Sequence, residues 1–252
     1  MRITPWMAAV AAMGLIMSCH KDDDNDEKPQ QGIFYGNKVN VGNGIARSFI
    51  SHTDDHDQME LGITLSASAL QGLSANEQEF ELDMPKEAAG LTPFDHIALG
   101  WMSHGHPDPV YHLPHFDIHF YMISKAEQET ISPDKPEMGL LPDLKFLPPE
   151  YINPDLTGVP KMGRHWVDPT GPEFQPGGKF TTAFLMGTYN RKVVFWEPMI
   201  TREYLTTKPD TVMAIPQPPA FQQKSHYPTR YEIRFDQQKQ EYRILMSGFE
   251  HR

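Results

Sequence analysis

Short segments in which apolar and polar residues alternate recur along this chain, and turn residues separate them. Residues 231–235 and 242–246 alternate in this way on either side of a turn at 236–240. Residues 180–189 and 192–196 are expected to form a second hairpin across a turn at Asn190-Arg191. Successive side chains of a strand point to opposite faces, so a period of two indicates half-buried strands joined as hairpins.

Proline and glycine favour the same class of fold. The chain has 23 prolines and 18 glycines in 252 residues, which is typical of many short elements joined by ordered turns and not of a helical bundle. The proline-rich residues 133–160 are expected to form a long, ordered surface loop. Further strands are expected at 32–51 (two), 59–65, 79–84 and 94–102, and short helices at 66–73 and 126–131. About ten strands with two or three short helices predict a mainly β protein, an antiparallel sandwich or barrel.

The N-terminal residues match the pattern of a signal peptide. Arg2 precedes a mostly apolar run at 6–17, which is shorter than the ~20 residues that a membrane-spanning helix needs. The Ile-Met-Ser-Cys sequence at 16–19 resembles the lipobox of bacterial lipoproteins and holds Cys19, the only cysteine in the chain. We therefore expect residues 1–18 to be removed and Cys19 to carry lipid. The alternative is an ordinary secretory signal with an incidental free cysteine.

Lipid on Cys19 would anchor the protein to a membrane in the cell envelope. Residues 19–31 are acidic and lack large apolar side chains, so we expect a solvated tether followed by a single domain at 32–252. The Lys-Asp-Asp sequence at 21–23 resembles a short acidic signal that directs some outer-membrane lipoproteins to the cell surface. The formal net charge of −11 argues against nucleic-acid binding, which requires basic patches.

A run of histidines is the main indication of chemistry. Of the twelve histidines, five lie close together: His104, His106, His112, His115 and His119. Neutral imidazole is a common ligand of divalent transition metals, and clustering reduces the entropy cost of assembling a site. These residues therefore predict a metal site, with zinc as the first candidate.

The segment at 115–120 reads as a strand. His115, Asp117 and His119 would then share one face, and the phenylalanines and isoleucine between them would share the other. His115 and His119 would lie about 13 Å apart on a straight strand, too far to share one ion comfortably unless a bulge bends it. The alternative is a helix, in which the two histidines would meet at i and i+4, but the glutamate of the HExxH pattern is missing.

More distant residues must complete a metal site, because zinc takes four ligands in total. His165 and Glu197 each stand among large apolar neighbours, where an unpaired charge would be costly. His106 lies between Gly105 and Pro107, so a role in a turn competes with metal ligation. The expected ligands are His106, His115, His119 and His165, with Asp117 and Glu197 as supporting groups or alternative ligands. His52, His56, His226 and His251 are expected at the surface.

Four segments resemble an uncharacterised family of exported bacterial proteins marked by a PHFDxHFY sequence. They are GHPDPVYHLPHFDIHFYMIS, PKMGRHWVDPTGPEF, YNRKVVFWEPMIT and HYPTRYEIRFD. The resemblance implies export, and the positions that match the family pattern are His106, His115, Asp117, His119, His165 and Glu197. His104 and His112 lie outside the pattern, and no activity is carried over.

Two functions fit these observations. In the first, a metal or a hydrogen-bonded network braces a non-catalytic surface protein whose loops bind a small-molecule or protein partner. In the second, zinc with an open position activates water in a hydrolase or lyase, and Asp117 or Glu197 orients a histidine or acts as base. We favour the first, because no nucleophile elbow, phosphate loop or known metalloenzyme signature is present in the sequence.

Overall fold

The computed structural model describes Met1 and residues 32–52, 58–154 and 156–252. The predicted signal peptide, Cys19, the tether and His56 lie outside the described residues. No helix within the described part of the chain has the length and apolar character that crossing a bilayer requires.

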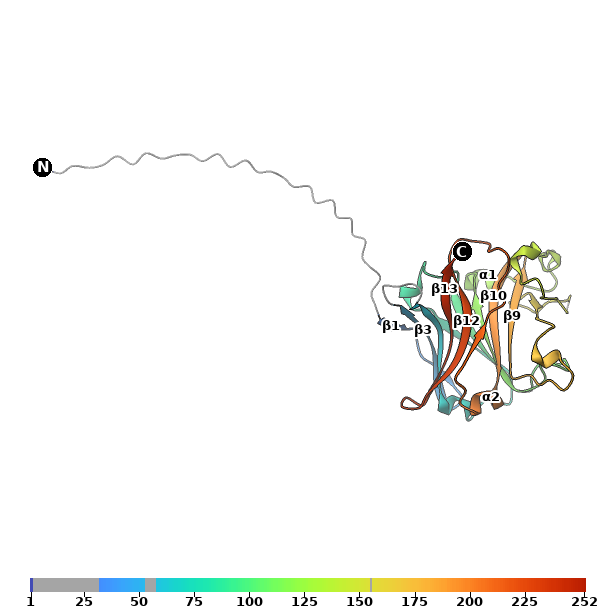
Figure 1. The fold of residues 1–252 in the computed structure, drawn as a ribbon, viewed down its shortest axis with the longest axis horizontal. Coiled ribbons are helices and arrows are strands. Elements are labelled where there is room, and N and C mark those ends of the chain that lie inside the picture. The colour runs from blue at the N-terminus through green and yellow to red at the C-terminus, as the bar shows by residue number, and fades with distance from the viewer. Residues whose placement is uncertain (2–31, 53–57, 155) are drawn as a thin grey trace.

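Two antiparallel sheets pack face to face (Figure 1). Sheet A has the order β1-β3-β4-β13-β12-β11, with β2 paired to β3. Its strands are β1 (Gly32–Tyr35), β2 (Val39–Val41), β3 (Gly44–His52), β4 (Glu60–Ser66), β11 (Thr211–Ala214), β12 (His226–Asp236) and β13 (Glu241–His251). Sheet B has the order β5-β6-β7-β10-β9-β8. Its strands are β5 (Gln78–Asp83), β6 (His96–Met102), β7 (His115–Tyr121), β8 (Arg164–Trp166), β9 (Thr182–Tyr189) and β10 (Lys192–Thr201).

This arrangement confirms the mainly β class and makes the fold an open sandwich instead of a closed barrel. Both predicted hairpins are present, as β9–β10 and β12–β13. Asn190 and Arg191 link the first hairpin with φ angles of 47° and 67°. Two consecutive left-handed residues form the tight turn whose twist matches that of the flanking strands.

The short elements depart most from the predictions. The helix predicted at 66–73 is only a 3-10 turn at Ala67–Leu70, and α1 (Lys125–Gln128) is shorter than expected. Ser124 caps α1 by accepting a hydrogen bond from the Glu127 amide. Residues 32–51 form three strands instead of two, and β8, β11 and α2 (Arg202–Thr206) were not predicted. Elements of three to five residues are too short for a period to register in the sequence.

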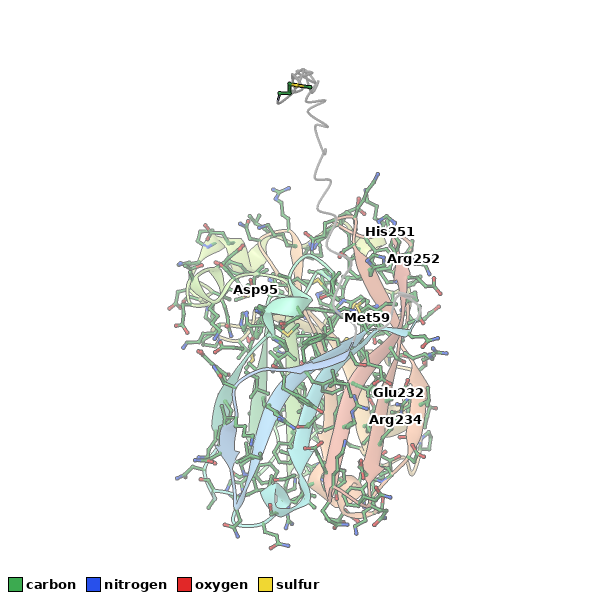
Figure 2. The ribbon with its side chains drawn as sticks, turned by 90° about the vertical axis from the view of Figure 1, so that its left-hand side faces the viewer. Met59, Asp95, Glu232, Arg234, His251 and Arg252 are labelled. Atoms are coloured by element: carbon green, nitrogen blue, oxygen red, sulfur yellow. The ribbon has the colours of Figure 1, made fainter. Side chains whose placement is uncertain are left out.

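The main core lies between the sheets. From β7, Phe116, Ile118 and Phe120 point into it and are fully buried, and they belong to the same apolar cluster as Ile63 and Ile244 of sheet A. The outer face of sheet A carries charged side chains, among them Arg234, which pairs with Glu60 and Glu232 (Figure 2).

The outer face of sheet B is covered by the long connections between its strands. Two smaller apolar clusters lie there, one around Tyr121 and Phe195 and one around Tyr111 and Phe180. The proline-rich connection contributes to this cover, because Met138 is buried in the cluster around Tyr121 and Phe195. On the central strands β7 and β10, polar side chains of this face are therefore shielded from solvent, although they lie outside the main core.

Candidate metal centres

β7 places a row of polar side chains on this shielded face. His115, Asp117 and His119 point away from the sandwich core, and each is at most 2% exposed. The strand conformation is the one predicted, and the helical alternative is wrong. Because successive members are two residues apart, their Cα atoms are separated by roughly 7 Å. Buried polar groups of this kind require partners.

The first group of possible ligands, here called site 1, consists of His106, His115 and Asp117. His106 comes from the loop that joins β6 to β7. Gly105, just before it, has a φ of +69°, and a Cβ there would overlap the backbone of His112. The amide of His106 then donates to the Tyr111 carbonyl oxygen over 2.9 Å, which closes the loop above the sheet.

The distances within site 1 are those of ligands around a small cation. His115 Nε2 lies 2.9 Å from Asp117 Oδ1, and His106 Nε2 lies 3.5 Å from Asp117 Oδ2. The two Nε2 atoms are 3.3 Å apart. Ligand atoms held about 2.0–2.2 Å from a tetrahedral zinc ion would be separated by about 3.3–3.6 Å, so little movement is needed to accommodate one.

The tautomer of His115 makes the arrangement more specific. Its Nδ1 donates to the Leu113 carbonyl oxygen over 2.6 Å, which leaves a lone pair on Nε2 of the neutral ring. That lone pair faces Asp117 Oδ1, which is itself a buried acceptor without a hydrogen-bond partner. Two acceptors this close repel one another unless a proton or a metal ion lies between them.

The second group, here called site 2, consists of His119, His165 and Glu197. The three residues lie on β7, β8 and β10, so all of them are held by sheet B. His119 Nε2 is 3.3 Å from Glu197 Oε1, and His165 Nε2 is 3.6 Å from Glu197 Oε2. His119 Nε2 and Glu197 Oε2 are buried without hydrogen-bond partners.

An aromatic ring fixes the two histidines of site 2. The ring of Phe195 packs edge-on against His119, with centroids 4.8 Å apart, and lies 5.2 Å from the ring of His165. Gly187 makes room for Phe195, because a Cβ at that position would overlap the ring. The geometry of site 2 thus depends on a glycine in the neighbouring strand β9.

Burial and charge affect the two sites differently. At site 1, burial acts to raise the pKa of Asp117, but a proton held between this carboxylate and His106 or His115 keeps that pKa well below its usual range. Burial acts to lower the pKa of His106, but the hydrogen bond and charge of Asp117 outweigh it, so that the pKa is raised. At site 2, burial raises the pKa of Glu197 well above its ordinary value and lowers that of His119 to about 3. Without a metal, site 1 favours an ion pair and site 2 favours neutral groups.

Each predicted ligand can now be placed. The structure brings all six residues into the two groups, with Asp117 and Glu197 as direct members, but it does not gather them at one centre. His115 is separated from His119 and His165, as the spacing on a straight strand requires.

The other histidines lie elsewhere. His104 and His112 are exposed, and His112 Nδ1 contacts the Pro109 carbonyl oxygen over 2.8 Å. The expectation that His52 lies at the surface is wrong, because Phe34 stacks on it and leaves it 3% exposed. His96 was not singled out from the sequence, yet it is buried, stacks on Tyr121 and lies 2.8 Å from Gln128 Oε1 through its Nε2.

Comparison with known proteins yields one partial match. Residues 59–101 match the model of the TTHB210-like family, which is described as "Hypothetical protein TTHB210". The matched segment runs from just before β4 to β6 and contains none of the six possible ligands. No curated protein and no solved structure matches the chain. The function must therefore be argued from the two sites themselves.

Proposed function

We propose that this protein is an exported, membrane-anchored lipoprotein whose β-sandwich binds divalent transition metal ions, zinc foremost, in a non-catalytic role. The observation that carries the metal proposal is the contact of His115 Nε2 with Asp117 Oδ1 at 2.9 Å, in which two buried acceptors face each other. The three buried atoms without partners in the two sites would each cost roughly 1–3 kcal/mol if left unsatisfied. One cation in each site would satisfy all of them.

The burial of the ligands supports a non-catalytic role. His115, Asp117, His119 and Glu197 are each at most 2% exposed, and aromatic side chains surround them. A substrate would need a path to the ion, and the most accessible ligand is His106, whose side chain is 36% exposed. Ions held in this way would brace the cover of sheet B or be stored there.

A metal-dependent hydrolase or lyase is the second candidate, and the number of ligands favours it. Each site supplies two histidines and one carboxylate, and zinc with three protein ligands keeps a fourth position for water. In that case the metal would lower the pKa of the bound water, and the chain would hold the ion and exclude bulk solvent. Cobalt-substituted protein separates the candidates: phosphate or a hydroxamate perturbs the visible spectrum of an open site and leaves a closed one unchanged.

The location rests on the N-terminal sequence. The lipobox-like residues 16–19 and the acidic residues that follow support lipid on Cys19, attachment to the outer membrane and exposure at the cell surface. The resemblance to an exported family supports the same setting, and the acidic charge argues against a nucleic-acid partner. Metabolic labelling with a fatty acid tests this part: Cys19→Ser should abolish labelling and release the protein from membranes.

Elemental analysis tests the metal proposal directly. The full chain, expressed with zinc and purified by gel filtration, should carry bound zinc, and a double variant His115→Ala with His165→Ala should lose it. His104→Ala is the matched control, because this exposed histidine lies outside both sites. Zinc-free protein after expression with excess zinc, cobalt or iron would refute the proposal.

A further inference from the structure

The carboxylates show how the two sites are related. Asp117 directs Oδ1 at His115 and Oδ2 at His106, so both of its oxygens lie within site 1. Glu197 directs Oε1 at His119 and Oε2 at His165, so both of its oxygens lie within site 2. Neither carboxylate bridges the sites. A pair of metal ions that shares a bridging ligand is therefore not the arrangement built here.

The sites are nevertheless close enough to influence one another. Asp117 and His119 are neighbours on one face of β7 with Cα atoms roughly 7 Å apart, and we take this spacing as the separation of the two centres. Each site contributes one carboxylate, so a bound divalent ion leaves a net charge of about +1 at each. Two unit charges at about 7 Å in an effective dielectric of about 20 weaken the binding of the second ion about 50-fold.

The way the ligands are held decides which site fills first. All three ligands of site 2 belong to strands of one sheet, and Phe195 packs against both of its histidines. Site 1 takes His106 from a loop, and this side chain is 36% exposed, against 21% for His165 in site 2. Ligands on rigid elements need less ordering when a metal ion binds, so site 2 should bind its ion more tightly and exchange it more slowly.

We infer that the protein binds two metal ions at separate mononuclear sites that fill in sequence, site 2 first and site 1 second. This inference rests on the proposed metal-binding function and deepens it. Site 2 binds its ion more tightly and releases it slowly. Site 1 exchanges its ion through movement of the His106 loop, so the protein acts as a reservoir that gives one ion to a stronger chelating partner and keeps the other.

Zinc titration of the full chain in detergent tests this inference. After the metal is removed, zinc is added in competition with a chromophoric chelator, and the release of zinc into excess chelator is then followed in time. Wild-type protein should bind two ions with affinities about 50-fold apart, and one ion should leave at least about tenfold faster than the other. Cobalt-loaded protein should give two high-spin signals without magnetic coupling, because no ligand bridges the ions.

Single variants assign the two ions. His106→Ala should retain only the slow ion, His165→Ala only the fast one, and the control His104→Ala both. Circular dichroism and thermal unfolding confirm that each variant is folded, and His106→Ala is the more secure test because its side chain lies on an accessible loop.

The failures can be told apart. No bound metal in the wild type would refute the proposed function itself. One ion that both variants lose would overturn the inference and leave metal binding intact, because it would show a single shared centre. Two ions that leave at equal rates, or that couple magnetically, would also overturn it.

Discussion

Replacing Gly187 by alanine tests whether the packing of Phe195 holds site 2 together. A Cβ at position 187 would lie under 3.0 Å from three carbons of the Phe195 ring, where ordinary carbon contacts are about 3.5–4.0 Å. Phe195 is fully buried, so the ring cannot turn into solvent. Overpacking of this kind typically costs about 1–3 kcal/mol, and the rigid backbone of β9 places this case toward the upper end.

We expect Gly187→Ala to lower the free energy of unfolding by about 2–3 kcal/mol. For a domain of this size, that corresponds to a fall in melting temperature of roughly 4–12 °C. Zinc affinity at site 2 should fall at least about tenfold, because the displaced ring contacts both of its histidines, whereas site 1 should be spared. Urea unfolding in the presence of a chelator measures the first effect, and competition with a chromophoric chelator measures the second.

Two further variants make the test decisive. Gly139→Ala is the matched control, since nothing lies within 4 Å of a Cβ there, and its effect should stay within about 0.5 kcal/mol. Phe195→Leu should partly rescue Gly187→Ala, with a coupling energy of about 1 kcal/mol or more in the double-mutant cycle. Additive effects, or a Gly187→Ala variant as stable as the control, would refute the reasoning.

Three other predictions concern the metal sites. Zinc binding should release protons at neutral pH, since the ion displaces a proton from Glu197 and from His106, whose pKa values are raised. The zinc affinity should then fall as the pH is lowered. Calorimetry in buffers of different ionisation enthalpy measures the number of protons released, and a pH-independent zinc affinity would contradict this prediction. Glu197→Gln should change the free energy of unfolding of metal-free protein by less than about 1 kcal/mol, because the buried carboxyl is already neutral, yet it should remove the site 2 ion. Urea unfolding measures the first effect and elemental analysis the second. A large loss of stability would contradict the neutral state of Glu197. Gly105→Ala forces alanine into a left-handed, crowded backbone position at a cost of about 1–3 kcal/mol. It should therefore weaken zinc binding at site 1 alone, which competition with a chelator measures. Equal weakening at both sites would contradict the role of the His106 loop.

The sheet class was predictable because its signals are local. Alternation over 115–120 defines which side chains of β7 face the core, and Asn190-Arg191 supplies the tight turn of one hairpin. The order of strands within each sheet depends on pairing between distant segments, such as β4 with β13, which no local pattern records. The burial of His52 was missed for the same reason, since it comes from Phe34 on the adjacent strand β1.

The candidate sites were predictable only in part. The common face of His115, Asp117 and His119 follows from the period of a strand, and so does their separation along it. The meeting of His165 with Glu197 depends on β8 lying beyond β9 at the edge of sheet B, and β8 has three residues and no detectable period. The membership of the two groups could not be read from the sequence, because it depends on which histidine rings lie beside each carboxylate.

β7 is unusual in being buried on both faces while carrying polar residues on one of them. A strand covered on both sides is ordinarily apolar throughout, because water cannot reach either face. Here the two small apolar clusters around Tyr121 and Tyr111 belong to the same shielded face of sheet B as the histidines and carboxylates. The low dielectric of this apolar environment strengthens the attraction between a cation and its ligands, and it also increases the free-energy cost of leaving those ligands unpaired. Burial of the polar side chains of β7 beneath this cover therefore requires a metal ion, or a proton in its place, between the facing ligand atoms.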